Sequence, residues 1–142
     1  MRQVNIYLMT IVKGLRAADG KLAYILEYKR EDKEPVTLTR IQNIEQCTAN
    51  VAEITAATEA LQRLTEPCEL DIYTDSNYLT SMLDRWLKEW EANGWQTARK
   101  KDIANKGMII NLDTLLKPHK YRIHNAVHHE YYDWLQNELN KA

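Results

Sequence analysis

Three segments in the first part of the chain alternate apolar and polar positions with the period of a β-strand. They are residues 4–12, 22–28 and 36–41. An Asp-Gly pair within residues 17–21 predicts a turn between the first two segments. A charged loop that ends at Pro35 separates the second segment from the third. The pattern therefore predicts a meander of three strands.

The spacing of apolar residues becomes helical after Cys47. Thr48 can cap a helix, and Pro67 ends it. The later elements are a strand at 69–74, a helix with an apolar stripe that ends before Asn93, a helix at 108–116, a strand at 120–126 and a helix at 130–141. The helix after the third strand is long enough for a crossover connection, so the order of elements predicts one α/β domain, residues 1–142, with a mixed sheet.

Composition narrows the class of protein. The 142 residues include 19 basic and 20 acidic side chains, and a net charge of -1 argues against a polybasic binder. The charge is uneven, however, because residues 99–122 carry seven basic and two acidic side chains, net +5. Cys47 and Cys68 are too few for a disulfide scaffold, and no segment is apolar over the length of a membrane span. We therefore expect a monomeric, cytoplasmic protein that does not enter membranes and could still bind nucleic acid locally.

Three carboxylates occupy positions in the predicted elements where they could bind a ligand. Glu53 falls within the apolar stripe of its helix, where an unpaired charge is costly, although an acid favoured by the helix dipole is the alternative. Asp75 directly follows the strand at 69–74, where ligand sites gather in α/β sheets, and helix capping is its alternative. Asp133 lies in the first turn of the last helix, where an exposed acid needs no function. None of the three identifies a function by itself.

The motifs around these acids are more specific. Residues 74–78 read Thr-Asp-Ser-Asn-Tyr, and a Trp-rich, then basic, segment follows at 85–101. Residues 48–54 read Thr-Ala-Asn-Val-Ala-Glu-Ile, and residues 130–135 read Glu-Tyr-Tyr-Asp-Trp-Leu. In this order the motifs resemble the type 1 ribonuclease H family over essentially the whole chain. The resemblance implies a ribonuclease H-like α/β fold, a five-stranded mixed sheet in the order 3-2-1-4-5 flanked by helices.

That family cleaves the RNA strand of RNA–DNA hybrids with two Mg²⁺ ions held by four carboxylates. The resemblance places Glu53, Asp75 and Asp133 at three of the four positions, as catalytic residues and as ligands of Mg²⁺ or Mn²⁺. In the family the fourth acid lies on the first strand and touches both ions.

The fourth carboxylate is missing from this chain. No acid precedes Asp19, and the corresponding position holds Met9, or Thr10 if the register shifts by one. A thioether is a poor ligand for Mg²⁺ because it is soft. The family's flexible loop before the last helix, which carries a catalytic His, is also shortened. His128 or His129 could replace that His, with exposed helix-start residues as the alternative.

Residues that would bind the substrate are better preserved. The resemblance assigns contacts near the minor groove of the hybrid to Asn50, Ser76 and Asn77, whose side chains suit 2′-hydroxyl and sugar contacts. The basic segment could bind phosphates irrespective of sequence, and a solvated basic loop is the alternative. Its cations are Arg99, Lys100, Lys101 and Lys106.

These observations support three hypotheses. The preferred one is a divergent ribonuclease H-like domain that binds RNA–DNA hybrid or other duplex nucleic acid, with an incomplete two-metal site, Mg²⁺ or Mn²⁺ binding weakened or lost, and weak or absent hydrolysis. The second is an active Mg²⁺-dependent endoribonuclease in which another group, such as Asp19, completes the site. The third is a non-catalytic protein-interaction module on the same fold.

Overall fold

The computed structural model describes residues 1–125 and 128–141 and contains a five-stranded sheet in the order β3-β2-β1-β4-β5. The strands are β1 (Arg2–Val12), β2 (Ala18–Tyr28), β3 (Val36–Cys47), β4 (Cys68–Thr74) and β5 (Lys120–Asn125). β1, β2 and β3 pair in antiparallel fashion, whereas β4 is parallel to both β1 and β5. The predicted mixed sheet and its strand order are confirmed.

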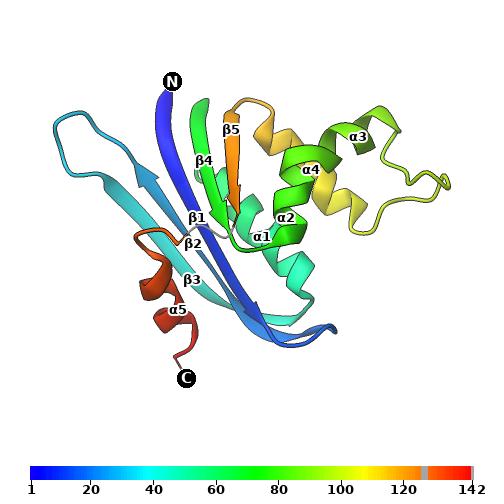
Figure 1. Ribbon diagram of the computed structural model, residues 1–142, viewed down its shortest axis with the longest axis horizontal. Coiled ribbons are helices and arrows are strands. Elements are labelled where there is room, and N and C mark those ends of the chain that lie inside the picture. The colour runs from blue at the N-terminus through cyan, green and yellow to red at the C-terminus, as the bar shows by residue number, and fades with distance from the viewer. Residues whose placement is uncertain (126–127, 142) are drawn as a thin grey trace.

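Helices cover the two faces of this sheet unequally (Figure 1). On one face lie α1 (Ala49–Gln62), α2 (Asn77–Ser81), the π-helical turn η1 (Met82–Trp86), α3 (Leu87–Ala92) and α4 (Lys106–Leu116). On the other face lies the short α5 (Tyr132–Leu139). Alternate residues of β1 serve the two cores, because Ile6 and Leu8 pack with the helices of the first face while Tyr7 and Met9 pack with α5.

The helices begin where capping residues occur in the sequence. The Thr48 hydroxyl accepts a hydrogen bond from the Val51 N–H at 3.2 Å, and the Ser76 hydroxyl accepts one from the Leu79 N–H at 3.0 Å. The apolar stripe of the second predicted helix packs against the core, and Trp86 is partly buried there, as expected. This helix is interrupted by η1 rather than continuous.

The predicted turn at residues 17–21 is wrong, because β2 begins at Ala18. The turn lies earlier, at Gly14, whose φ of +84° favours glycine. Gly20 lies opposite Val12 within the hairpin, next to a break in the pairing of β2 with β3. A Cβ atom at position 20 would overlap the Ile11 carbonyl oxygen. This glycine therefore permits close approach of two strands, not a reversal of the chain.

Other element boundaries also differ from the predictions. β3 extends to Cys47 instead of residue 41, and α5 is shorter than the helix predicted at 130–141. Ala126, the last residue of the strand predicted at 120–126, lies outside the described residues. Within the described part of the chain, none of the helices combines the length and the apolar character of a membrane span.

Candidate functional site

Glu53 is a buried carboxylic acid enclosed by two threonine hydroxyls. It lies just past the first turn of α1, and its exposure is 5%. The Thr10 hydroxyl donates to Glu53 Oε1 at 2.7 Å, and the Thr74 hydroxyl donates to Oε2 at 3.3 Å. Burial, together with the nearby charge of Asp75, raises the pKa of Glu53 to about 7. The alternative interpretation of Glu53 as a first-turn acid is wrong, because α1 has no acid in its first turn.

Asp75 lies beside Glu53, at the carboxyl end of β4. Its side chain is exposed, and its charge is one of the causes of the raised pKa of Glu53. The alternative in which Asp75 caps the next helix is wrong, because Ser76 is the N-cap of α2. The Glu53 and Asp75 carboxyl groups thus lie close enough, near the carboxyl end of β4, for the charge of one to affect the other.

Asp133 is separate from the other two acids. Its side chain is 81% exposed in the first turn of α5, and its only ion-pair partner among the described residues is His128, whose Nε2 is 3.1 Å from Asp133 Oδ1. No group of three His, Cys, Asp or Glu side chains within residues 1–125 and 128–141 is arranged to hold a metal ion. The structure thus brings together two of the three predicted ligands.

The two positions considered for the missing acid face opposite sides of the sheet. Met9 is 3% exposed and packs with Leu135 beneath α5, whereas Thr10 contacts Glu53. Only Thr10 therefore faces the pair of acids. Asp19 does not complete the pair either, because its carboxylate accepts hydrogen bonds from the Gln46 main-chain N–H and side-chain amide at 3.0 and 3.3 Å.

The two candidate histidines have different surroundings. The His128 side chain is 68% exposed and pairs with Asp133. His129 is half-buried, and its ring centroid lies 4.5 Å from that of Tyr7. His129 Nδ1 accepts the Tyr131 N–H at 3.1 Å, and burial lowers the pKa of His129. Thus His129 holds the start of α5, and His128 is the one that solvent can reach.

The predicted minor-groove residues lie at the starts of two helices. Asn50 is exposed in the first turn of α1, and Ser76 uses its hydroxyl to cap α2. Asn77 is exposed, and its Oδ1 accepts a hydrogen bond from Asn125 Nδ2 at 2.8 Å, which leaves its own amide N–H groups directed elsewhere. Sequence reasoning missed Asn125 because only the neighbouring carboxyl ends of β4 and β5 bring it close to Asn77. It also missed Thr74, although the Thr-Asp-Ser motif contains it.

The basic segment forms a projection between α3 and α4 (Figure 1). A bridge between Gln96 and Asp102 closes it, and the Thr97 N–H donates to the Lys101 carbonyl at 2.7 Å. Three of its cations are exposed and form no ion pair with a described residue, namely Arg99, Lys100 and Lys101. The fourth, Lys106, pairs with Asp102 at 3.3 Å.

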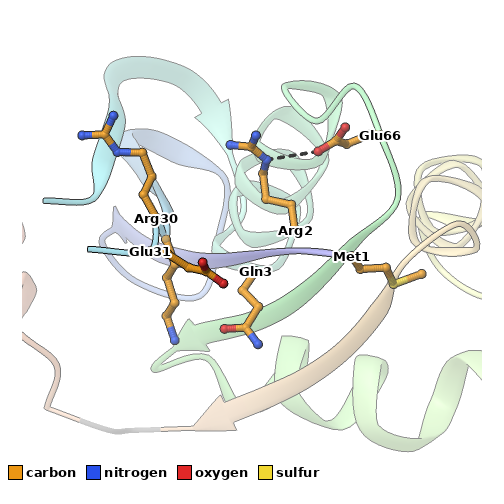
Figure 2. Close-up of a pocket in the computed structure, with 7 residues that line it drawn as sticks. Met1, Arg2, Gln3, Arg30, Glu31 and Glu66 are labelled. Carbon is orange, nitrogen blue, oxygen red and sulfur yellow. Dashed lines mark hydrogen bonds and ion pairs between the residues drawn. The ribbon is translucent and has the colours of Figure 1, made fainter. Parts of the chain in front are cut away.

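A cavity of about 690 Å³ lies away from these residues, around the amino end of β1 (Figure 2). Figure 2 shows Arg2 at this cavity already paired with Glu66 at 3.1 Å. Its lining consists of Met1, Arg2, Gln3, Lys29, Arg30, Glu31 and Glu66. No residue proposed from the sequence lines it, so it is distinct from the candidate site.

Comparison with known proteins decides the family. The profile of the family described as RNase H matches residues 13–137. A ribonuclease H of Acetivibrio thermocellus is 37% identical over 124 residues, which cover 86% of this chain and 80% of that relative. The chain belongs to the RNase H family.

Other similarities cover less or show the fold alone. A ribonuclease H of Cupriavidus pinatubonensis is 46% identical over 77 residues, so that this chain spans about half the length of that relative (53%). The crystal structure of LC9-RNase H1, a type 1 RNase H with the type 2 active-site motif, has a TM-score of 0.76 at 18% identity and covers 97% of this chain and 70% of that one. A foamy viral protease-reverse transcriptase in complex with RNA/DNA hybrid has a TM-score of 0.65 at 15% identity, covering 97% of this chain and 19% of that one.

Members of the RNase H family generally depend on divalent metal ions, and Glu53 and Asp75 are the two predicted ligands of this chain that lie near each other among the described residues. Glu53 has a pKa of about 7 in the absence of a cation, so Mg²⁺ binding there would displace a proton, and both of its oxygens accept threonine hydroxyls. Asp75 is the one acid beside it, and Asp133 pairs with His128 instead.

Proposed function

We propose that this RNase H-family chain binds RNA–DNA hybrid or a related nucleic-acid duplex and hydrolyses it weakly or not at all. The observation that carries the proposal is the closed environment of Glu53, whose oxygens accept the Thr10 and Thr74 hydroxyls where the family has a metal ligand. A cation bound here would have to displace the Glu53 proton and compete with the two threonine hydroxyls, with Asp75 as the one acidic neighbour. Asp133 pairs with His128 and does not form a three-acid group with Glu53 and Asp75 among the described residues.

Exposed polar and basic side chains support the binding part of the proposal. Asn50 and Asn77 are exposed at the helix starts next to the two acids, and the projection offers the cations Arg99, Lys100 and Lys101. Contacts of this kind act on sugars and phosphates, which are the same for every base sequence. A relative of the same fold, the foamy viral enzyme, binds an RNA/DNA hybrid. The proposal also includes a monomeric state and a location in the reducing cytoplasm, where the free thiols of Cys47 and Cys68 would remain reduced.

The decisive experiment is a cleavage assay with a labelled RNA–DNA hybrid in Mg²⁺ and in Mn²⁺. We expect a rate at least about 100-fold below that of the Acetivibrio thermocellus relative measured in parallel, because loss of a direct ligand costs more than loss of a residue that supports one. Asp75→Asn is the control, and any remaining cleavage that it leaves unchanged is contamination. Robust cleavage that Asp75→Asn abolishes would support the active endoribonuclease instead.

A pair of substitutions tests the position of the missing acid. Thr10→Asp places a second carboxyl group against Glu53, so we expect tighter Mn²⁺ binding by calorimetry and a gain in cleavage over the parent chain. Met9→Asp buries a carboxyl group beneath α5 and should cost about 3 kcal/mol or more of the free energy of unfolding. A gain in cleavage with Met9→Asp alone would show that position 9, not position 10, supplies the absent ligand.

A further inference from the structure

Glu27 is a second buried carboxylate, on the opposite face of the sheet from Glu53. It lies on β2, its exposure is 5%, and it is paired with Asn5 across the β1–β2 ladder. No described Lys, Arg or His forms an ion pair with it. A buried charge without a cation is costly, so other polar groups must compensate for the lost hydration.

Three side chains donate hydrogen bonds to the Glu27 carboxylate. Asn5 Nδ2 and the Tyr7 hydroxyl reach Oε1 at 2.9 and 3.2 Å. The Tyr131 hydroxyl reaches Oε2 at 2.6 Å, which is the short distance of a bond to an ionised oxygen. Burial acts to raise the pKa of Glu27, but the hydrogen bond from Tyr131 and those from its other neighbours outweigh burial and lower it. The neighbouring Glu27 carboxylate raises the pKa of Glu130.

The donor Tyr131 is the residue at which α5 begins. Its side chain bonds to β2, its N–H donates to His129 Nδ1, and its carbonyl accepts the Leu135 N–H at 2.9 Å. The Tyr131 ring packs edge-on against Tyr7, with centroids 4.9 Å apart, and the His129 ring packs against Tyr7 from another direction. The start of α5 is therefore attached to the sheet through Glu27 and its partner Tyr7.

The rest of α5 is held by few contacts, which include the partly buried Tyr132 and, past the end of the helix, a hydrogen bond from Lys21 Nζ on β2 to the Lys141 carbonyl at 2.6 Å. The helix spans Tyr132–Leu139, and only Leu135 and Leu139 are buried beneath it. An isolated helix of this length is unstable in water, so α5 depends on tertiary contacts for its structure. Asp133 and Trp134 on its outer side are exposed.

We propose that Glu27 is the positioning residue of α5, acting through the Tyr131 hydroxyl. The buried negative charge fixes the beginning of the helix on the sheet, so that α5 opens as a local unit when this bond is lost while the sheet and α1 stay folded. α5 also carries Asp133, so its position could affect binding of nucleic acid or metal at that residue, and this consequence rests on the proposed function. The docking of α5 itself does not.

Residue-resolved amide hydrogen exchange of the full chain, without nucleic acid or added metal, tests the proposal. Glu27→Gln and Tyr131→Phe should each lower protection of α5 amides by about tenfold or more, because each removes a charge-assisted hydrogen bond. The double variant should lower it no further than the more severe single variant, since both act on the same bond. Protection of β1, β4 and α1 should remain that of the parent chain.

Glu31→Gln is the matched control, because it removes one negative charge from an exposed position shortly after β2. It should leave α5 protection unchanged. Unchanged α5 protection in both Glu27→Gln and Tyr131→Phe would overturn the proposal. So would an equal loss over the sheet and α1, since it would show a role in global stability alone. Hydrogen exchange without nucleic acid does not depend on hybrid binding, so a failure of the proposed function and a failure of this inference are distinguishable.

Discussion

Replacing Glu53 by glutamine is expected to stabilise the protein by about 3 kcal/mol at about pH 8 and to change its stability little at about pH 4.5. The ordinary pKa of a glutamate is 4.5, and burial raises the pKa of Glu53 to about 7 in the folded chain. Between these values the folded state holds a proton that the unfolded state has lost, so stability falls as pH rises through this interval. Above it the folded protein carries a buried charge, which glutamine removes while keeping the side-chain shape.

Urea unfolding of the parent and Glu53→Gln at both pH values measures this difference. Glu45→Gln is the control, because Glu45 is exposed on β3 and the same chemical change there should be nearly neutral. If Glu53→Gln were destabilising at both pH values, the carboxylate would be ionised and stabilised by its two threonine partners. A stabilising effect at about pH 8 would show that the ionised Glu53 carboxylate lowers the stability of the folded protein.

Replacing Arg99, Lys100 and Lys101 together by alanine is expected to weaken binding of an RNA–DNA hybrid by about tenfold or more at about 150 mM salt. The three cations are exposed on the projection and have no described ion-pair partner, so they are available to phosphates. For each phosphate that the variant no longer neutralises, the slope of log affinity against log salt should also fall by about one.

Fluorescence anisotropy over a range of about 50 to about 200 mM salt gives both quantities. The matched control replaces Lys29, Arg30 and Lys33, which are exposed at the other end of the sheet, and therefore removes the same charge. Equal losses in the two variants would mean that net charge, not the projection, governs binding. No binding at the lowest salt would favour the protein-interaction module.

Local sequence patterns were sufficient to identify the two acids of the candidate site, Glu53 and Asp75. Asp75 follows a strand and precedes a capped helix, and a short motif contains Thr74, Asp75 and Ser76 together, so adjacent residues supplied the pattern. Glu53 could also be recognised from local sequence, because it is a charged residue within the apolar stripe of its helix. Contacts between distant segments had no such signal. Thr10 meets Glu53 across 43 positions of the chain, and Asn125 meets Asn77 across 48.

Element boundaries failed where the tertiary environment overrode a local preference. The Asp-Gly pair at positions 19 and 20 has turn chemistry, yet it lies within the hairpin because the Asp19 carboxylate bonds to Gln46 on β3. α5 begins after Tyr131, whose hydroxyl bonds to Glu27 on β2, rather than at residue 130 as predicted. Neither partner could be inferred from neighbouring residues.

The sequence by itself determined the class of fold, the strand order through its motifs, and the two acids beside β4, because hydrophobic periodicity and adjacent motif residues act locally. It also determined the family, since the motifs extend over most of the chain. Only the tertiary structure decided that Thr10 rather than Met9 faces Glu53, that Asp133 pairs with His128, and that the Tyr131 hydroxyl bonds to Glu27. The physical reason is that burial and hydrogen bonding depend on which distant segments the sheet brings together, and these contacts raise the pKa of Glu53 and lower that of Glu27.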